Sequence, residues 1–279
     1  MKYAFLILNY KSYNDTIKLC DEIQSESFSD YHILIVDNAS PNESCEILRK
    51  YTESKNNVEL LENSENAGYA KGNNKGLIYL GKYEPEYVII LNNDVHFTKS
   101  VIEHLESVYE MLPDAGVISP RQILPNGEFA QYTNLNHPTF FSDILSYTPF
   151  SRRRHKYGCN TIYKDVQKVA IVPGAFLFTR YSRFKEVGFF YNETFLFCEE
   201  RFTARRFADN GYSNYLLLDC TYLHEHSKTI KANVKGSNQK QYVLEGKLKY
   251  TKEYRRFPAL KCAIIRFFYS LEQWYTNLK

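Results

Sequence analysis

The sequence predicts an α/β fold with a mostly parallel open sheet, helices on both faces and a helical C-terminal extension. Apolar, β-type runs alternate with amphipathic stretches through about the first 120 residues. Each strand, helix, strand repeat implies a right-handed parallel crossover. The run "YVIILNNDV" also ends abruptly in polar residues, as a buried parallel strand does where its carboxyl end meets a ligand site.

The individual elements follow from the period of the apolar residues. The expected strands are residues 3–8, 32–37, 58–62, 87–92 and 116–120. Helical spacing predicts helices between them, near residues 13–25, 43–55, 72–80 and 99–110.

The second half of the chain is less regular. Pro125-Asn126-Gly127 predicts a hairpin turn, and the stretch from about 131 to 168 is either a substrate-facing insertion or a surface excursion. The segment "VAIVPGAFLFTR" predicts a strand pair around Pro173-Gly174, followed by a helix near 199–209 and a strand at 215–219. We therefore expect a catalytic domain over residues 1–226 and a basic, helical extension over 227–279.

Composition narrows the class of protein. Hydrophobic residues make up 44% and charged residues 24%, which is ordinary for a globular chain, while 16% aromatics is high and fits an aromatic core or a sugar-binding surface. The net charge of +3 gives no argument for nucleic acid. Six scattered cysteines without zinc spacing favour a reduced, cytoplasmic chain. No apolar run approaches the roughly 20 residues that span a bilayer.

Polar side chains follow three of the predicted strands. Asn9, Asp37 and the pair Asn93-Asp94 stand at strand ends, so they should meet at one edge of the sheet. Asp94 is the candidate for chemistry. At the strand tip Asp37 can accept a hydrogen bond from a nucleobase ring N–H, although "DNASPNES" also suits a turn and a helix cap.

Three further segments carry candidate residues. The Gly- and Asn-rich loop from Glu65 to Gly76 lets backbone approach a ligand, although a plain turn explains it nearly as well. Glu199 and Glu200 stand in tandem at a helix start, where they either favour the helix dipole or supply a general base. His224 follows the last strand and is either structural or shares a metal with a carboxylate.

Seven segments in this order resemble the inverting glycosyltransferases of family 2, within their rhamnosyltransferase-like or galactofuranosyltransferase-like group. They are "ILNYKS", "IVDNASPN", "NAGYAKGNNKG", "LNNDV", "VPGAFLFTR", "VGFFYNETFLFCEE" and "LHEHS". The resemblance implies a GT-A fold and transfer of a sugar from a nucleotide-diphosphate donor to a glycan or lipid-linked glycan in bacterial surface polysaccharide synthesis.

The resemblance also assigns roles. Asp94 would hold Mn²⁺ or Mg²⁺, with Asn92 replacing the first acid of the family's DxD-type motif and His224 completing the metal site. The implied donor-binding residues are Asn9, Asp37, Asn66, Gly68, Asn74 and Asn93. Glu200 occupies the position of the family's usual aspartate base, and the choice between Glu199 and Glu200 stays open.

Two other functions compete with this interpretation. A sugar nucleotidyltransferase would need a Gly-rich basic loop directly after the first strand, where this chain has "NYKSYND". A catalytically silent relative that binds glycans or acts as a scaffold is compatible with the missing first acid and with the Glu-Glu pair. Hydrolysis of a sugar nucleotide would favour the enzyme.

The C-terminal segment predicts an amphipathic helix for a membrane surface. Its apolar stripe is Leu260, Ile264, Phe267, Phe268, Leu271, Trp274, Tyr275 and Leu278, and its nearby cations are Arg255, Arg256, Lys261 and Arg266. We expect peripheral attachment at the inner membrane face. Packing on the catalytic domain and a homodimer contact fit the pattern equally well.

Overall fold

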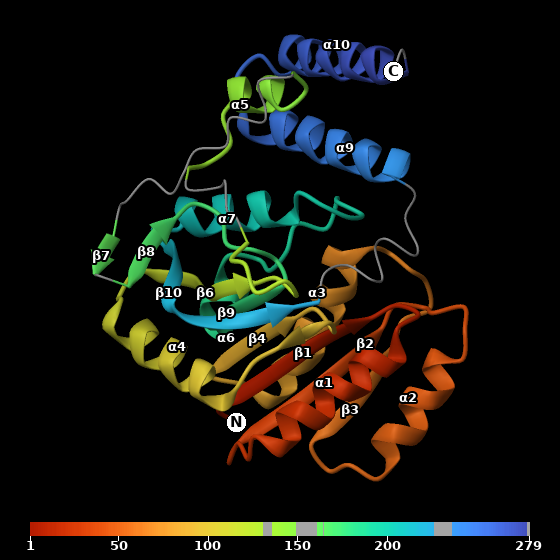
Figure 1. Ribbon diagram of the computed structural model, residues 1–279, viewed down its shortest axis with the longest axis vertical. Coiled ribbons are helices and arrows are strands. Elements are labelled where there is room, and N and C mark those ends of the chain that lie inside the picture. Colours follow the sequence, from red (N-terminus) through yellow and green to blue (C-terminus); the bar gives the residue numbers. More distant parts are fainter. Residues whose placement is uncertain (131–135, 149–160, 164, 226–235, 278–279) are drawn as a thin grey trace.

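The computed structural model describes residues 1–130, 136–148, 161–163, 165–225 and 236–277 (Figure 1). Its first part is a parallel sheet in the order β3-β2-β1-β4. The elements are β1 (Tyr3–Asn9), α1 (Tyr13–Ser25), β2 (Tyr31–Asp37), α2 (Ser44–Glu53), β3 (Val58–Glu62), α3 (Tyr69–Leu80), the 3-10 turn η1 (Gly81–Tyr83) and β4 (Tyr87–Leu91). The strands and helices predicted over this part are confirmed.

The sheet continues from β4 in the order β9-β6-β10-β8-β7, and β5 pairs with β10. The elements are β5 (Val95–His96), α4 (Lys99–Met111), β6 (Ala115–Ile123), β7 (Thr161–Tyr163), β8 (Val166–Val169), β9 (Phe176–Arg180), α6 (Tyr181–Glu186), α7 (Glu199–Asp209) and β10 (Ser213–His224). Strand β9 runs antiparallel to β4 and β6, whereas β10 runs parallel to β6. The sheet is therefore mixed in this half.

One predicted pairing is wrong. Strands β8 and β9 do flank Pro173-Gly174, but β6 and β10 lie between them in the sheet. A Pro-Gly dipeptide suits a tight turn. Here the connection from β8 to β9 instead passes the ends of β10 and β6, and residues 173–175 line a cavity. The turn at Pro125-Asn126-Gly127 is confirmed, because the Leu124 amide donates to the Glu128 carbonyl at 2.8 Å.

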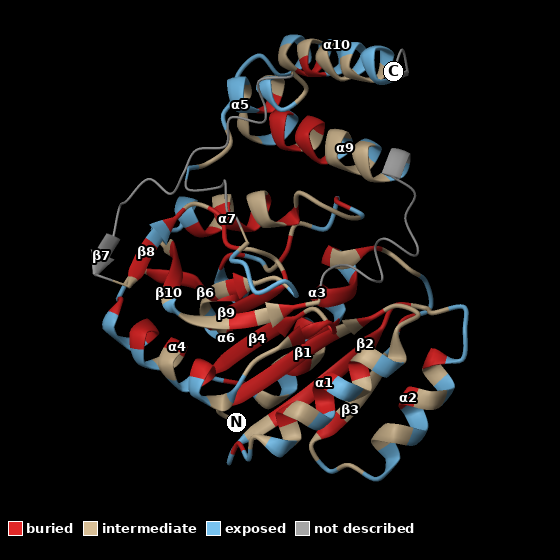
Figure 2. Ribbon diagram, in the orientation of Figure 1, coloured by how far each residue is buried: buried red, intermediate tan, exposed pale blue. Residues whose placement is uncertain are grey.

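Apolar side chains form a layer on each face of the sheet. Leu19 of α1, Leu48 of α2 and Leu105 of α4 belong to the cluster on one face. The other cluster is built by α3, α6 and α7. Strands β1 and β4 are buried along almost their whole length because their side chains meet a layer on both faces (Figure 2). This double burial explains their continuous apolar sequences.

The C-terminal helices form a separate group next to α7 (Figure 1). Helices α9 (Gly236–Tyr254) and α10 (Pro258–Asn277) pack on each other, and α10 also contacts α5 (Phe140–Leu145). Their small core contains Leu248, Cys262 and Ile265. The expected boundary at 226/227 lies outside the described residues. Over the described part of the chain, every helix is too short or too polar to cross a membrane.

Candidate active site

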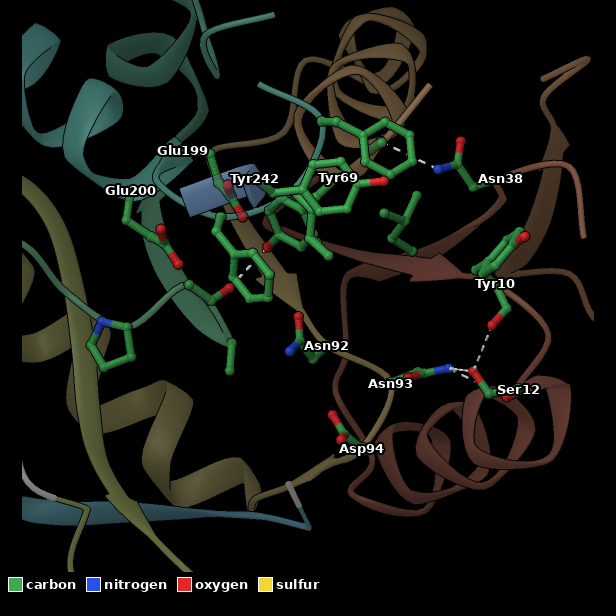
Figure 3. A pocket seen from close by; sticks show the side chains of 18 of the residues that line it. Tyr10, Ser12, Asn38, Tyr69, Asn92, Asn93, Asp94, Glu199, Glu200 and Tyr242 are labelled. Atoms are coloured by element: carbon green, nitrogen blue, oxygen red, sulfur yellow. Dashed lines mark hydrogen bonds between the residues drawn. The ribbon is translucent and has the colours of Figure 1, made fainter. Parts of the chain in front are cut away.

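A cavity of about 580 Å³ opens at the carboxyl ends of β1 and β4. It is bordered by residues from the ends of β1, β4 and β10, the starts of α3 and α7, the 173–175 connection and helix α9. The sequence-predicted residues that line it are Asn66, Gly68, Asn93, Asp94, Glu199, Glu200 and His224. The tandem acids and Asp94 lie on opposite sides of it (Figure 3).

Asn9 and Asp37 lie behind the cavity wall. Both side chains are fully buried, and neither is among the residues that line the cavity. The Asn9 amide donates to the Asp37 carboxylate at 2.7 Å, and the Ser40 amide and hydroxyl donate to it at 2.8 and 2.7 Å. The following turn thus captures the carboxylate that the sequence assigned to a nucleobase. In this geometry Asp37 positions the strand ends.

Asn38, which the sequence argument passed over, links the strand end to the loop before α3. Its amide donates to the Asn66 side chain at 2.9 Å and to the Gly68 carbonyl at 3.2 Å, and it lines the cavity. Gly68 has φ 90°, and a Cβ built there would lie 2.1 Å from the Phe195 carbonyl oxygen. Glycine is therefore required for this loop to reach the segment before α7.

Asn74 and Asn93 tie separate elements together. The Asn74 amide donates to the Phe190 carbonyl at 2.8 Å, and the Phe190 amide donates back at 3.0 Å, so Asn74 clamps α3 to that loop outside the cavity lining. Asn93 does line the cavity, and it donates to the Ser12 hydroxyl at 2.7 Å. Ser12 and the neighbouring Tyr10 border the cavity too, and sequence reasoning did not single them out.

Asp94 and His224 form a buried pair at the cavity. Their partner atoms, Asp94 Oδ1 and His224 Nε2, lie 3.1 Å apart, because β5 pairs antiparallel with the end of β10. The Tyr222 hydroxyl donates to the Gln122 side-chain oxygen at 3.4 Å, which turns the Gln122 amide nitrogen toward His224 Nδ1 at 3.1 Å. The imidazole therefore presents Nε2 to the carboxylate.

A carboxylate oxygen and an imidazole nitrogen are suitable ligands for a divalent cation such as Mn²⁺. Gln122, which sequence reasoning also missed, orients the ring through Nδ1 and leaves the ring proton on Nε2, facing Asp94. Binding of a cation at Nε2 would require this proton to move to Nδ1 and the Gln122 amide to turn its oxygen toward it. Among the described residues, one group of three side chains lies close enough together to bind a metal ion. It consists of His104, Asp219 and Cys220, and it does not border the cavity. The Asp94 and His224 pair fits a cation that takes its other ligands from a bound molecule.

Glu199 and Glu200 begin α7 and both line the cavity. Glu199 is 5% exposed, and its Oε2 is buried without a hydrogen-bond partner among the described residues. Burial raises the pKa of the Glu199 carboxyl well above its usual range, and the charge of Glu200 raises it further. Burial also raises the pKa of the half-buried Glu200. A carboxylate with a raised pKa is a better proton acceptor.

The chain enters α7 through strained backbone. Phe197 and Cys198 have φ values of 67° and 69°, in the left-handed region that ordinary side chains rarely adopt. Such conformations cost of the order of 1–3 kcal/mol each and persist only where the surroundings impose them. Here they aim the tandem acids into the cavity.

Gly174 leaves room for Glu200. A Cβ at Gly174 would lie 2.6 Å from Glu200 Oε1 and 3.2 Å from its Cγ. The Gly174 carbonyl also accepts a hydrogen bond from the Tyr69 hydroxyl at 2.9 Å. The connection after β8 thus fixes where the Glu200 carboxylate lies.

Solved structures share this fold. GalNAc-T7 with UDP, GalNAc and Mn²⁺ matches with a TM-score of 0.60 at 11% identity, covering 81% of this chain and 44% of that one. S. aureus TarS 1–349 in complex with UDP-GlcNAc gives 0.59 at 16% identity, over 96% and 71%. The mannosyltransferase PcManGT from Pyrobaculum calidifontis, in complex with GDP-Man and Mn²⁺, gives 0.59 at 14%, over 97% and 69%. These similarities identify the fold as GT-A, as the sequence predicted.

Sequence comparison gives the family. The low-salt glycan biosynthesis hexosyltransferase Agl10 of Haloferax volcanii is 25% identical over 198 residues, which is 71% of this chain and 58% of that protein. The chain therefore spans less than two thirds of that relative's length. A family model described as Glycosyl transferase family 2 matches residues 5–188. The chain belongs to glycosyl transferase family 2, and this sequence prediction is confirmed.

Proposed function

We propose that this protein transfers a sugar, with inversion, from a nucleotide-diphosphate donor to a glycan or lipid-linked glycan acceptor. The observation that carries the proposal is the opposed placement of Glu200 and Asp94 across one cavity (Figure 3). An in-line displacement needs a proton acceptor on the nucleophile's side and charge stabilisation on the leaving group's side. Family membership and the GT-A fold agree with this chemistry.

We call the side of the cavity that carries Glu199 and Glu200 the acid side. There, Glu200 accepts the proton of the acceptor hydroxyl. The hydroxyl oxygen forms its bond to the anomeric carbon while the bond from that carbon to the diphosphate oxygen breaks. Glu200 suits this role because it is less buried than Glu199 and stands beside the bare Gly174 backbone. Burial raises the pKa of the Glu199 carboxyl well above its usual range, so Glu199 is the member of the pair that keeps a proton while Glu200 is ionised.

We call the opposite side, where β4 and β10 end, the strand-end side. There, Asp94 and His224 would hold Mn²⁺ or Mg²⁺. A bound cation supplies Lewis-acid stabilisation of the leaving diphosphate. Asn93 and Asn38 keep the loops around it in place through hydrogen bonds to Ser12 and Asn66. Tyr10 offers an aromatic face at the same end of the cavity, where a nucleobase can stack.

A donor screen tests this function. UDP-, dTDP- and GDP-sugars would be screened by thermal shift with Mn²⁺, followed by measurement of nucleotide release with and without glycans. We expect one base class to stabilise the protein and its sugar nucleotide to be hydrolysed slowly without acceptor. Binding of glycans without hydrolysis of any donor would support the silent relative instead.

We also propose that α10 lies on an anionic membrane surface. Cys262 and Ile265, which are not part of the predicted stripe, face the helical group and are buried. Leu260, Phe267 and Trp274 of the stripe are 64, 60 and 63% exposed. Leu271 and Phe257 extend this exposed face, and Arg256 and Arg266 are exposed beside it. An apolar face flanked by cations complements an anionic lipid surface. Leu278 lies outside the described residues.

Vesicle sedimentation tests this surface. The double variant Phe267→Ser, Trp274→Ser should lose sedimentation with phosphatidylglycerol vesicles, whereas Met111→Ser, which changes an exposed apolar residue on α4, should retain it. Unchanged sedimentation of the double variant would overturn the proposal. Loss of a dimer in analytical ultracentrifugation would assign the face to a second copy of the chain.

A further inference from the structure

Helix α9 contributes directly to the cavity. Asn238 and Tyr242, both in the C-terminal helical group, line it together with the tandem acids. The family match ends at residue 188, so this wall lies beyond the matched region. The cavity is thus completed by a part of the chain outside that match.

Tyr242 meets an aromatic residue of the loop before α7. Its ring lies 5.2 Å from that of Phe195, with the planes tilted by 37°. Phe195 is 39% exposed although it lies beside the cavity, and Tyr242 is half-buried. Figure 3 shows Tyr242 entering the cavity next to Glu199, away from Asp94. The pair therefore presents apolar ring surface on the acid side.

A backbone hydrogen bond fixes the position of Phe195, and an ion network fixes the helix that carries Tyr242. The Tyr69 amide donates to the Phe195 carbonyl at 2.8 Å, and the missing side chain of Gly68 allows this approach. Directly after α9, Arg255 donates to the buried Asp143 of α5 at 2.8 Å, and Arg201 donates to the same carboxylate at 3.0 Å. Since Arg201 follows Glu200 on α7, this ion network joins α9 to the helix of the acids.

We propose that Phe195 and Tyr242 form an acceptor subsite that stacks on the apolar C–H face of a pyranose ring. The inference rests on the proposed transferase function. A sugar ring placed there lies on the side of Glu200, where a hydroxyl must be deprotonated, and leaves the Asp94 side to the donor. An aromatic wall with few polar groups is the usual surface for such a ring.

Ligand-observed NMR tests the subsite. A panel of methyl pyranosides would be titrated by saturation transfer in the presence of Mn²⁺ and either UDP or GDP. We expect Tyr242→Ala to weaken the binding of the bound glycoside about 3–10-fold and Tyr242→Phe to preserve it. Tyr79→Ala, which truncates a half-buried tyrosine at the other end of α3, is the matched control.

Donor hydrolysis without acceptor separates this inference from the proposed function. The control Tyr79→Ala should hydrolyse the donor at the wild-type rate, because Tyr79 does not line the cavity. Equal glycoside binding by the wild-type and Tyr242→Ala proteins, or no glycoside binding by the wild-type protein, overturns the subsite. Absence of donor hydrolysis in the wild-type protein would count against the transferase itself.

Discussion

The two sides of the cavity differ in how fully their polar groups are paired. Around the strand ends, the side chains of Asn9, Asp37 and Asn38 all have hydrogen-bond partners at 2.7–3.2 Å. On the acid side, Glu199 Oε2 is buried without a partner among the described residues. This difference agrees with the proposed roles: hydrogen bonds already organise the strand-end side, whereas the unpaired, buried carboxyl oxygen of Glu199 carries an energetic cost of the kind found at reactive sites.

The largest expected effect is on the acid side. Glu200→Gln should lower turnover by about 10²–10⁴-fold, the usual range for loss of a general base. Donor affinity should persist, because the paired groups at the strand ends are untouched. Steady-state kinetics and donor titration of the same variant measure both quantities.

Glu199→Gln serves as the comparison for this first prediction. It should change turnover less, and the wild-type rate should rise with pH through a raised carboxyl pKa, since the base must be ionised. If Glu199→Gln abolishes turnover and Glu200→Gln does not, the assignment within the pair is reversed.

The second effect tests how closely the acid is positioned. Gly174→Ala would place a Cβ 2.6 Å from Glu200 Oε1, which is the movable end of a side chain, so the carboxylate should shift while the fold persists. A misplacement of about 1 Å can cost about 10²-fold in rate. We expect that loss in turnover with an unchanged melting temperature and donor affinity. Full activity would show that the position of Glu200 is not critical.

The third effect belongs to the strand-end side. Asp94→Asn should weaken donor binding in Mn²⁺ by about 10–100-fold, because a neutral oxygen holds a cation poorly. Calorimetric titration with and without Mn²⁺ measures this change. Asp219→Asn is a matched control, since Asp219 pairs with His104 at 2.9 Å outside the cavity. Equal donor affinity of wild-type protein in EDTA and Mn²⁺ would contradict a metal role for Asp94.

The same comparison explains what could be predicted from sequence. The alternation of apolar runs with amphipathic helices predicts the parallel half of the sheet. Asp94, Glu199 and Glu200 could be singled out because they are polar residues that follow apolar runs. The burial of Asp37 could not, since it depends on donors that the following turn supplies. The place of Tyr242 in the cavity could not be predicted either, because packing of α9 against a loop far away in the sequence brings it to Phe195. A helical pattern does not indicate which face of the helix meets a cavity.

The smallest expected effect concerns stability. Because the pKa of Glu199 is raised above its ordinary value of 4.5, the folded protein binds more protons than the unfolded chain between those two pKa values. Stability therefore falls as pH rises through that window. Glu199→Gln removes this cost, so the variant should melt near the wild-type temperature at about pH 4.5 and above it at neutral pH. The gain should be about 2–4 °C for each kcal/mol relieved.

Melting curves across this pH range measure the difference, with Asp219→Asn as the exposed control. Parallel curves for wild type and Glu199→Gln would mean that burial of the Glu199 carboxyl carries no electrostatic cost, and the contrast between the two sides would be lost.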